Sequence, residues 1–246
     1  MLNLVKTLFF LSLAALVFGF CKGDVLPSPS ELLPQLKTDP LQTPTFRAPF
    51  DVSVKQITYR IKPLYHYELY GLVVSKHEAD SFIDQVHKSW GDHLNAADLC
   101  VIWGKNALSG AYEQIEFSSG QWTCYAQTKS QEAWESFSEH HISNNHMISE
   151  RHELLQTLRR ARVGDQVHFK GYLAEYSHDN FLRGSSTVRT DSGNGACETV
   201  YMESFTILKP GPRRWRIVRW VSALVLLLSV CAWFFMPIGY TAYTEE

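Results

Sequence analysis

Apolar residues gather in two uncharged runs near the ends of the chain. Residues 7–20 are apolar after the single charge of Lys6, and residues 220–239 carry no charge at all. About 20 apolar residues in a helix span the roughly 30 Å hydrocarbon core of a bilayer. We therefore expect a membrane-anchored protein, with a signal-like or transmembrane segment at 1–21 and a transmembrane helix at 220–239.

Between these runs, apolar and polar positions alternate with the period of strands. This pattern predicts strands at 53–62, 65–75, 98–104, 114–118, 121–128, 166–176, 181–189 and 196–208. Helical spacing predicts helices at 76–93, 131–137 and 149–162, the last capped by Ser149. The fold class expected is α+β with an antiparallel sheet and two or three helices, and a small OB-like barrel is a narrower alternative.

Proline and charge mark the remaining segments. Six prolines in 25–50 predict an extended stalk or wrap. The expected division is therefore 1–21 apolar segment, 22–51 Pro-rich linker, 52–208 soluble α+β domain, 209–219 basic juxtamembrane segment, 220–239 transmembrane helix and 240–246 tail.

The distribution of charge leaves the orientation in the membrane open. Lys6 favours a cytoplasmic N-terminus and an exported domain, whereas the arginines at 213–219 favour a cytoplasmic domain. These arginines predict membrane lipid as a partner, through anionic headgroups. The formal net charge of −2 argues against a nucleic-acid partner.

The five cysteines include no C-x-x-C pair, which argues against a zinc knuckle or a thioredoxin-like site. Cys21 and Cys231 lie in or beside the apolar runs. Cys100 and Cys124 lie on neighbouring predicted strands, so they can form a disulfide if the domain is exported. The alternative is that the three cysteines of the domain are buried or free thiols.

The segment 189–198 is the strongest candidate for chemistry. Gly193 and Gly195 permit positive φ, so the loop can present backbone N–H groups to an anion. Asp191 and Glu198 have the chemistry of an acid and a base, and Cys197 that of a nucleophile. The alternative is a tight hairpin loop whose polar side chains bond their own backbone.

A second candidate is the histidine-rich run at 140–146. Its spacing differs from a helical metal-binding pair with a catalytic Glu between, so we expect a capping loop and neither metal nor cofactor. If this run folds beside the glycine loop, a polar pocket results. Its candidate binding residues are Asn144, Asn145, Ser185, Arg189, Gly193 and Gly195, and its candidate catalytic residues are His146, Asp191, Cys197 and Glu198.

Four motifs in 98–205 carry a resemblance. They are Asp98–Gly104 (D-L-x-x-x-W-G), the Ser-Asn-Asn-His run at 143–146, Gly164–Leu173 (G-D-x-V-x-x-x-G-x-L) and Asp191–Glu198 (D-S-G-x-G-A-C-E). In this order they resemble a set of bacterial membrane-anchored proteins of uncharacterised function. The resemblance implies a bacterial, membrane-associated protein and carries over no catalytic residue. The anchor in that set is usually N-terminal, so the C-terminal apolar run is a departure.

Taken together, these features predict a membrane-tethered accessory or binding module of the bacterial inner membrane, and no enzyme. Its partners would be membrane lipid and, as a further candidate, another membrane protein. The alternative is a hydrolase that uses His146 with Asp191, Cys197 or Glu198, which requires these groups to meet in an open cleft. A lipid- or peptidoglycan-binding domain is a third class and requires an exposed aromatic groove.

Overall fold

The computed structural model describes residues 2–81, 84–179, 181–188, 190–191 and 196–235. Within it the chain forms two compact units. One contains residues 1–25 and 212–246, and the other contains Leu26–Gly211, which we call the head.

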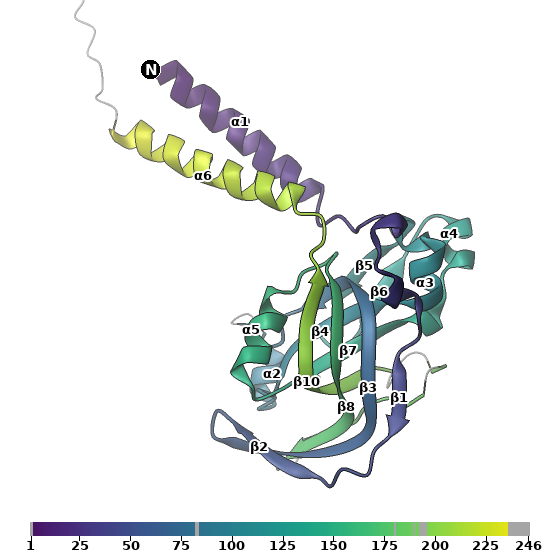
Figure 1. Cartoon of the computed structure of the whole chain (residues 1–246). Coiled ribbons are helices and arrows are strands. Elements are labelled where there is room, and N and C mark those ends of the chain that lie inside the picture. Colours follow the sequence, from purple (N-terminus) through teal and green to yellow (C-terminus); the bar gives the residue numbers. More distant parts are fainter. Residues whose placement is uncertain (1, 82–83, 180, 189, 192–195, 236–246) are drawn as a thin grey trace, which may run out of the picture. The chain divides into compact units, whose positions relative to one another are not determined.

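The first unit consists of two apolar helices, α1 (Leu2–Cys21) and α6 (Arg214–Phe235). Both are long and apolar enough to cross a membrane, and both are largely exposed. They lie side by side and antiparallel, because Phe9 meets Trp233 near one end and Phe18 meets Trp215 near the other (Figure 1). Helix α6 starts six residues before the predicted apolar run, so it includes most of the basic segment.

The head contains the remaining elements. Its strands are β1 (Leu41–Pro44), β2 (Phe50–Val54), β3 (Ile57–His77), β4 (Asn95–Ile102), β5 (Glu116–Ser119), β6 (Cys124–Gln127), β7 (Ile142–Ile148), β8 (Gln166–His178), β9 (Phe181–Arg183) and β10 (Glu198–Lys209). Its α-helices are α2 (Gln85–Ser89), α3 (Gly104–Ser109), α4 (Gln131–Ser136) and α5 (His152–Arg160). Short 3-10 helices lie at Pro29–Glu31, Pro34–Lys37, Ala111–Gln114 and Glu139–His141.

The main sheet is mixed, which corrects the expectation of an antiparallel sheet. Strands β7 and β10 run parallel, whereas the other pairings of this sheet are antiparallel. After β7, the chain passes through α5 into β8. Strand β10 then pairs antiparallel with β8 and therefore runs in the same direction as β7. The α+β class is confirmed.

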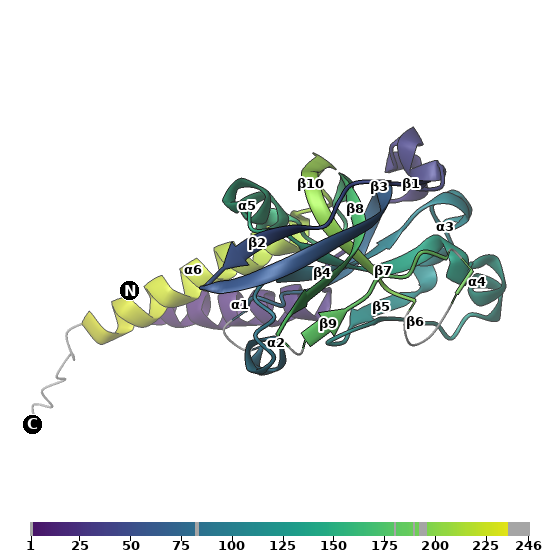
Figure 2. The same cartoon turned by 90° about the horizontal axis from the view of Figure 1, so that it is seen from below.

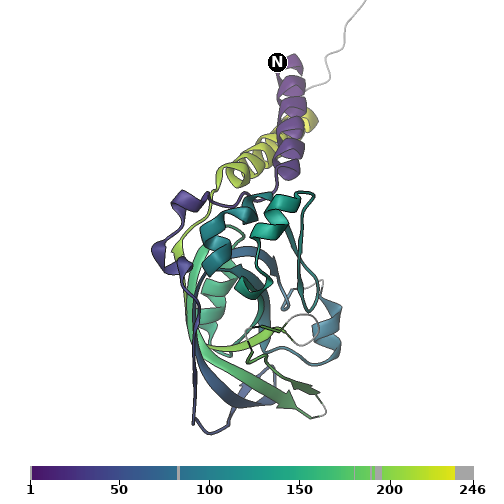
Figure 3. The same ribbon diagram turned by 90° about the vertical axis from the view of Figure 1, so that its right-hand side faces the viewer.

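The sheet curls strongly around its core, as Figure 3 shows, but it is not a closed barrel. The cause is the 21-residue strand β3, which takes different neighbours along its length. Strand β8 pairs with Arg60–Leu72 and β4 pairs with Leu72–His77, so the two neighbours meet β3 together only at Leu72. Strands β7 and β10 complete the path from β4 to β8. Because β4 and β8 overlap on β3 at Leu72 alone, the sheet curls without being a closed barrel.

The concave side of this sheet forms the largest apolar core. It includes Leu69, Leu99, Phe169 and Met202, each buried, and Leu154 and Leu158 of α5 cover it. The Pro-rich residues that follow α1 also pack onto the head: Leu36 is fully buried, and the Gln166 side chain accepts from Leu33 N and donates to Glu31 O. These residues therefore wrap the head.

Two predicted elements differ from the structure for local reasons. The strand predicted at 53–62 is a β2–β3 hairpin, because Lys55 and Gln56 take positive φ (48° and 68°) and reverse the chain (Figure 2). The long helix predicted at 76–93 shrinks to α2. There β3 continues to His77, and Gly91, with φ of 68°, directs the chain out of the helix.

Candidate functional site

A polar face on β4 and β7 forms the centre of the candidate site. In their antiparallel register, Asp98 lies opposite His146 and Cys100 lies opposite Asn144. Because side chains alternate along a strand, these four residues share one face, while Leu99 and Asn145 point to the other. Buried polar residues on both faces of β7 explain why 142–148 did not show a strand pattern.

Asp98 and His146 form a buried pair on this face. His146 Nδ1 lies 2.7 Å from Asp98 Oδ1, and the Asn95 amide donates to the same oxygen at 2.8 Å. Burial alone would raise the pKa of Asp98, but the charge and hydrogen bond of His146, with the Asn95 amide, outweigh it and lower this pKa. Asp98 is therefore ionised at neutral pH although it is fully buried.

Hydrogen bonds continue from this pair to a second group, formed by His77, Asp84 and His87. The Asn95 amide nitrogen lies 3.4 Å from His87 Nε2. Asp84 Oδ2 lies 2.6 Å from His87 Nδ1 and 2.8 Å from His77 Nε2. Burial opposes ionisation of Asp84, but hydrogen bonds from His77 and from the backbone and ring of His87 lower its pKa to about 2.

Asp84 is held in place by the start of α2. Its other oxygen, Oδ1, accepts from the backbone N–H groups of Val86 and His87, each at 3.0 Å. This is an N-cap, in which a carboxylate satisfies donors that a helix leaves free. The N-cap fixes the position of Asp84, so Oδ2 points at both imidazoles.

Aromatic rings and one arginine cover this polar network. The Trp122 ring lies 4.3 Å from His87 and 6.3 Å from His146, and Trp90 stacks on it at 5.3 Å. The Arg183 guanidinium lies 4.0 Å from the Trp122 ring and 3.8 Å from Asp92 Oδ2. Trp90 is half-exposed, so an aromatic surface lies directly over the buried polar groups.

A disulfide fixes this aromatic cover to the sheet. Cys100 on the polar face bonds Cys124, at the start of β6. Strands β5 and β6 form the hairpin that carries Trp122, so the bond attaches the hairpin to β4. The structure thus contains the Cys100–Cys124 pairing that the sequence left as one of two alternatives.

Cys197 belongs to this site but does not have the character of a nucleophile. Its thiol donates to the Trp122 carbonyl oxygen at 3.2 Å, and Asn144 Nδ2 lies 3.9 Å from its sulfur. Burial raises the pKa of Cys197 to about 11. At neutral pH the group is therefore a thiol, whereas nucleophilic attack requires the thiolate.

The other sequence candidates that the structure describes form hydrogen bonds or strand pairs with groups other than His146. Asp191 is exposed and accepts from Ser186 Oγ at 2.6 Å, and Ser185 Oγ accepts from Thr199 N. Asn145 bonds the Leu99 carbonyl oxygen. Glu198 is buried at the start of β10, in register with Asn145. Arg189, Gly193 and Gly195 lie outside the described residues.

Sequence reasoning missed five residues of the network: His77, Asp84, His87, Asp98 and Arg183. Asp84 carried a usable signal, since an Asp before a short apolar-periodic segment is a typical N-cap. Asp98 opens the D-L-x-x-x-W-G motif, but the motif assigned it no role in a site. His77, His87 and Arg183 carried no signal, because strand pairing brings distant parts of the chain together. Of the three histidines in the run at 140–146, His146 lies in this network and His141 Nε2 lies 3.4 Å from Asp39 Oδ1.

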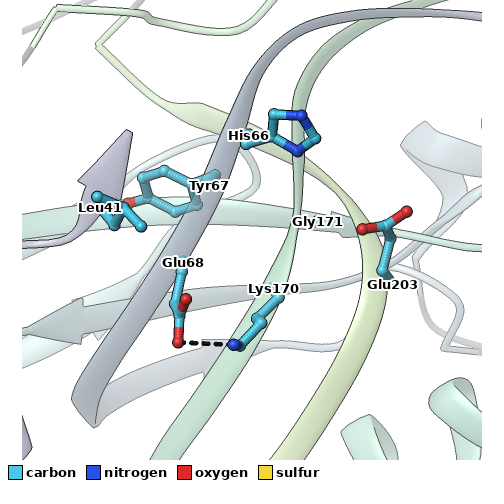
Figure 4. A pocket seen from close by; sticks show the side chains of 7 residues that line it. All are labelled: Leu41, His66, Tyr67, Glu68, Lys170, Gly171 and Glu203. Atoms are coloured by element: carbon cyan, nitrogen blue, oxygen red, sulfur yellow. Dashed lines mark ion pairs between the residues drawn. The ribbon is translucent and has the colours of Figure 1, made fainter. Parts of the chain in front are cut away.

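A separate hollow of about 140 Å³ lies on the outside of β3 and β8 (Figure 4). Its lining is Leu41, His66, Tyr67, Glu68, Lys170, Gly171 and Glu203. The Glu68 carboxylate bonds Lys170 at 3.0 Å and His168 at 2.8 Å, so its charge is already paired. These contacts are typical of a solvated salt bridge on a sheet surface.

No family model matches this chain, and neither a curated protein nor a solved structure shows significant similarity to it.

Proposed function

We propose that the protein is a membrane-tethered binding module of the bacterial inner membrane. The observation that carries this proposal is a folded head whose chain continues at both ends into apolar helices of 20 and 22 residues. Such helices satisfy their own backbone hydrogen bonds and place apolar side chains outward, which suits a lipid environment. The bacterial origin rests on the sequence resemblance alone.

The binding face of this module is the polar face of β4 and β7 with its aromatic cover. Three oxygens buried there have no hydrogen-bond partner among the described residues: Asp98 Oδ2, Asn95 Oδ1 and Asn144 Oδ1. Buried polar atoms are normally satisfied, so unpartnered acceptors favour a bound group that supplies donors or positive charge. Trp90 and Trp122 add the flat apolar surface that ligand sites commonly offer.

The order of the strands supports the same face. Strands β3, β4, β7, β10 and β8 pair in succession, and α5 lies between β7 and β8. This order fits an OB-type, partly open Greek-key arrangement, in which ligands bind on the second and third strands. Those strands are β4 and β7 here. The acidic groups of this face disfavour a nucleic-acid ligand.

We place the head on the exported side of the membrane. Disulfides such as Cys100–Cys124 persist in oxidising compartments and are rare in the cytosol. Both apolar helices then cross the membrane, and Lys6 lies on the cytoplasmic side as the charge rule favours. The arginines at the start of α6 oppose this orientation, although Asp24 bonds both Arg216 and Arg219, at 3.2 and 2.8 Å.

Extraction and thiol labelling of native membranes test this proposal. We expect detergent to release the protein and a carbonate wash to leave it in the membrane. After denaturation, a maleimide reagent should modify the three free cysteines, Cys21, Cys197 and Cys231, and all five only after reduction. Release by carbonate would contradict the tether. Five reactive thiols without reduction would contradict the exported side.

The hydrolase alternative has one observation in its favour, the Asp98–His146 pair, since a buried carboxylate orients a catalytic imidazole in many hydrolases. The Cys197 thiol is protonated at neutral pH, however, because burial raises its pKa to about 11. His146 is also only 2% exposed beneath Trp122. Among the described residues, His146 is thus covered rather than open to a cleft, so we rank the hydrolase alternative second.

A further inference from the structure

We propose that His77, Asp84 and His87 form a binding site for a divalent transition metal ion, with Zn²⁺ as the best-fitting class. This inference goes beyond the proposed function and does not depend on membrane tethering. Each residue offers one ligand atom, and the three atoms lie within 4.8 Å of one another. Among the described residues, no other group of three or more histidine, cysteine or acidic side chains brings its ligand atoms this close together.

The three ligand atoms need only a small displacement to hold a metal. The two imidazole nitrogens lie 2.8 and 2.6 Å from Asp84 Oδ2. Ligands at about 2.0–2.1 Å from a tetrahedral zinc are roughly 3.4 Å from one another. The metal would therefore replace the two hydrogen bonds while each ligand moves by less than about 1 Å.

The site is built on fixed backbone rather than on a free loop end. His77 is the last residue of β3, paired in register with Asp98 of β4. Asp84 uses Oδ1 for the backbone of α2 and keeps Oδ2 for the imidazoles. Metal ligands are typically held by such additional hydrogen bonds, which reduce the entropy lost on binding.

The balance of charge in this region favours a cation. Asp84 and Asp98 are buried, and among the described residues their ion-pair partners are imidazoles alone. The Arg183 guanidinium lies 3.8 Å from Asp92 Oδ2. Two carboxylates therefore lie in one buried region, and buried charges require a partner. A divalent ion bound to Asp84 would offset this negative charge.

The ligand set selects the class of metal. Two imidazole nitrogens and one carboxylate oxygen suit Zn²⁺ and related transition ions, whereas Ca²⁺ and Mg²⁺ prefer oxygen ligands throughout. Three protein ligands leave a fourth tetrahedral position. The His77 side chain is 26% exposed, so solvent reaches the site at this ligand, and water or an external ligand would complete the coordination.

The test uses the full-length protein in detergent, stripped of metal with a chelator and without an affinity tag. Equilibrium dialysis against micromolar Zn²⁺, followed by elemental analysis, should find one equivalent bound. Substitution by Co²⁺ should give the visible absorption of a tetrahedral site. Zn²⁺ should also raise the melting temperature by about 5 °C, because a ligand that binds only the folded state stabilises it.

The variants His77→Ala and Asp84→Asn should each reduce Zn²⁺ affinity at least 10-fold and abolish the thermal shift. The matched control is His152→Ala, because His152 lies exposed on α5 and bonds Gln156. A Cys197→Ser variant should retain the metal, which excludes binding to the thiol. If Asp84→Asn fails to fold, the result for His77→Ala decides whether the site binds the metal, since the His77 side chain is partly exposed. Absence of binding by the wild type, or equal binding by His77→Ala, overturns the proposal.

Discussion

At the scale of single residues, buried polar groups distinguish this head from an ordinary apolar core. Asp84, Asp92 and Asp98 are each at most 5% exposed, and each has hydrogen bonds to side chains or backbone. Leaving one partner of such a bond unpaired costs more than the bond itself contributes. The network therefore specifies one arrangement of β4, β7 and α2.

Asp98 offers a direct test of this network. Asp98→Asn should lower the free energy of unfolding by about 2 kcal/mol at pH 7, because a charged hydrogen bond to His146 is lost. The pKa of Asp98 is lowered by folding, so its stabilisation is present above the unfolded value of about 4 and is lost as pH falls through the folded pKa. The measurement is urea unfolding at pH 7 and pH 3.

The wild type should lose more stability between these two pH values than the variant does. Asp51→Asn is the matched control, because Asp51 forms an ion pair with Arg60 in which both side chains are 54% exposed. Such surface pairs contribute less than about 1 kcal/mol. An unchanged pH dependence in Asp98→Asn would rule out the role assigned to its carboxylate.

At the scale of elements, alternation located most strands but not where they end. The predicted strands at 166–176 and 196–208 correspond to β8 and β10, because one face of each is buried in the core. The hairpin at 114–128 is present as β5 and β6. Helix α5 begins at His152 rather than after Ser149, and the Lys76 amine bonds the Leu158 and Ala161 carbonyl oxygens at its end.

Close strand packing makes one glycine of β8 irreplaceable. A Cβ at Gly171 would lie 1.9 Å from the Tyr201 carbonyl oxygen on β10. Gly171→Ala should therefore force β8 and β10 apart and destabilise the head by about 3 kcal/mol. Thermal unfolding followed by near-UV circular dichroism measures this loss.

Gly184 provides the control for this substitution, since no atom of the described residues lies within 4 Å of a Cβ built there. Gly184→Ala should change stability by less than about 1 kcal/mol. Equal melting temperatures for Gly171→Ala and the wild type would show that β8 and β10 are less closely packed than described.

At the scale of the whole molecule, the stability of the head depends on the redox state of its compartment. The Cys100–Cys124 bond closes a loop with a sequence separation of 24, and it attaches the β5–β6 hairpin to the sheet. Cross-links of this size contribute about 3 kcal/mol, mainly by restricting the unfolded chain. If the head is exported, it lies in an oxidising compartment, where this disulfide and its contribution to stability persist.

Cys124→Ala should therefore lower the free energy of unfolding by about 3 kcal/mol under oxidising conditions. A reductant should lower the wild type to the same level and leave the variant unchanged. Cys231→Ala is the control, because this free thiol lies on α6. Urea unfolding with and without the reductant is the measurement. Equal stabilities of the wild type and Cys124→Ala in the absence of reductant would contradict a structural role for the bond.

The sequence by itself determined the properties that depend on local composition and periodicity. The two apolar helices, the α+β class, β8 and β10 follow from residues adjacent in the chain. The tertiary structure decided the parallel pairing of β7 with β10, the disulfide and the polar network. His77, Asp84, Asp98 and His146 come from separate segments, and only strand pairing and the N-cap of α2 bring them together. Spacing along a chain does not encode contacts of this kind, because they depend on which strands become neighbours.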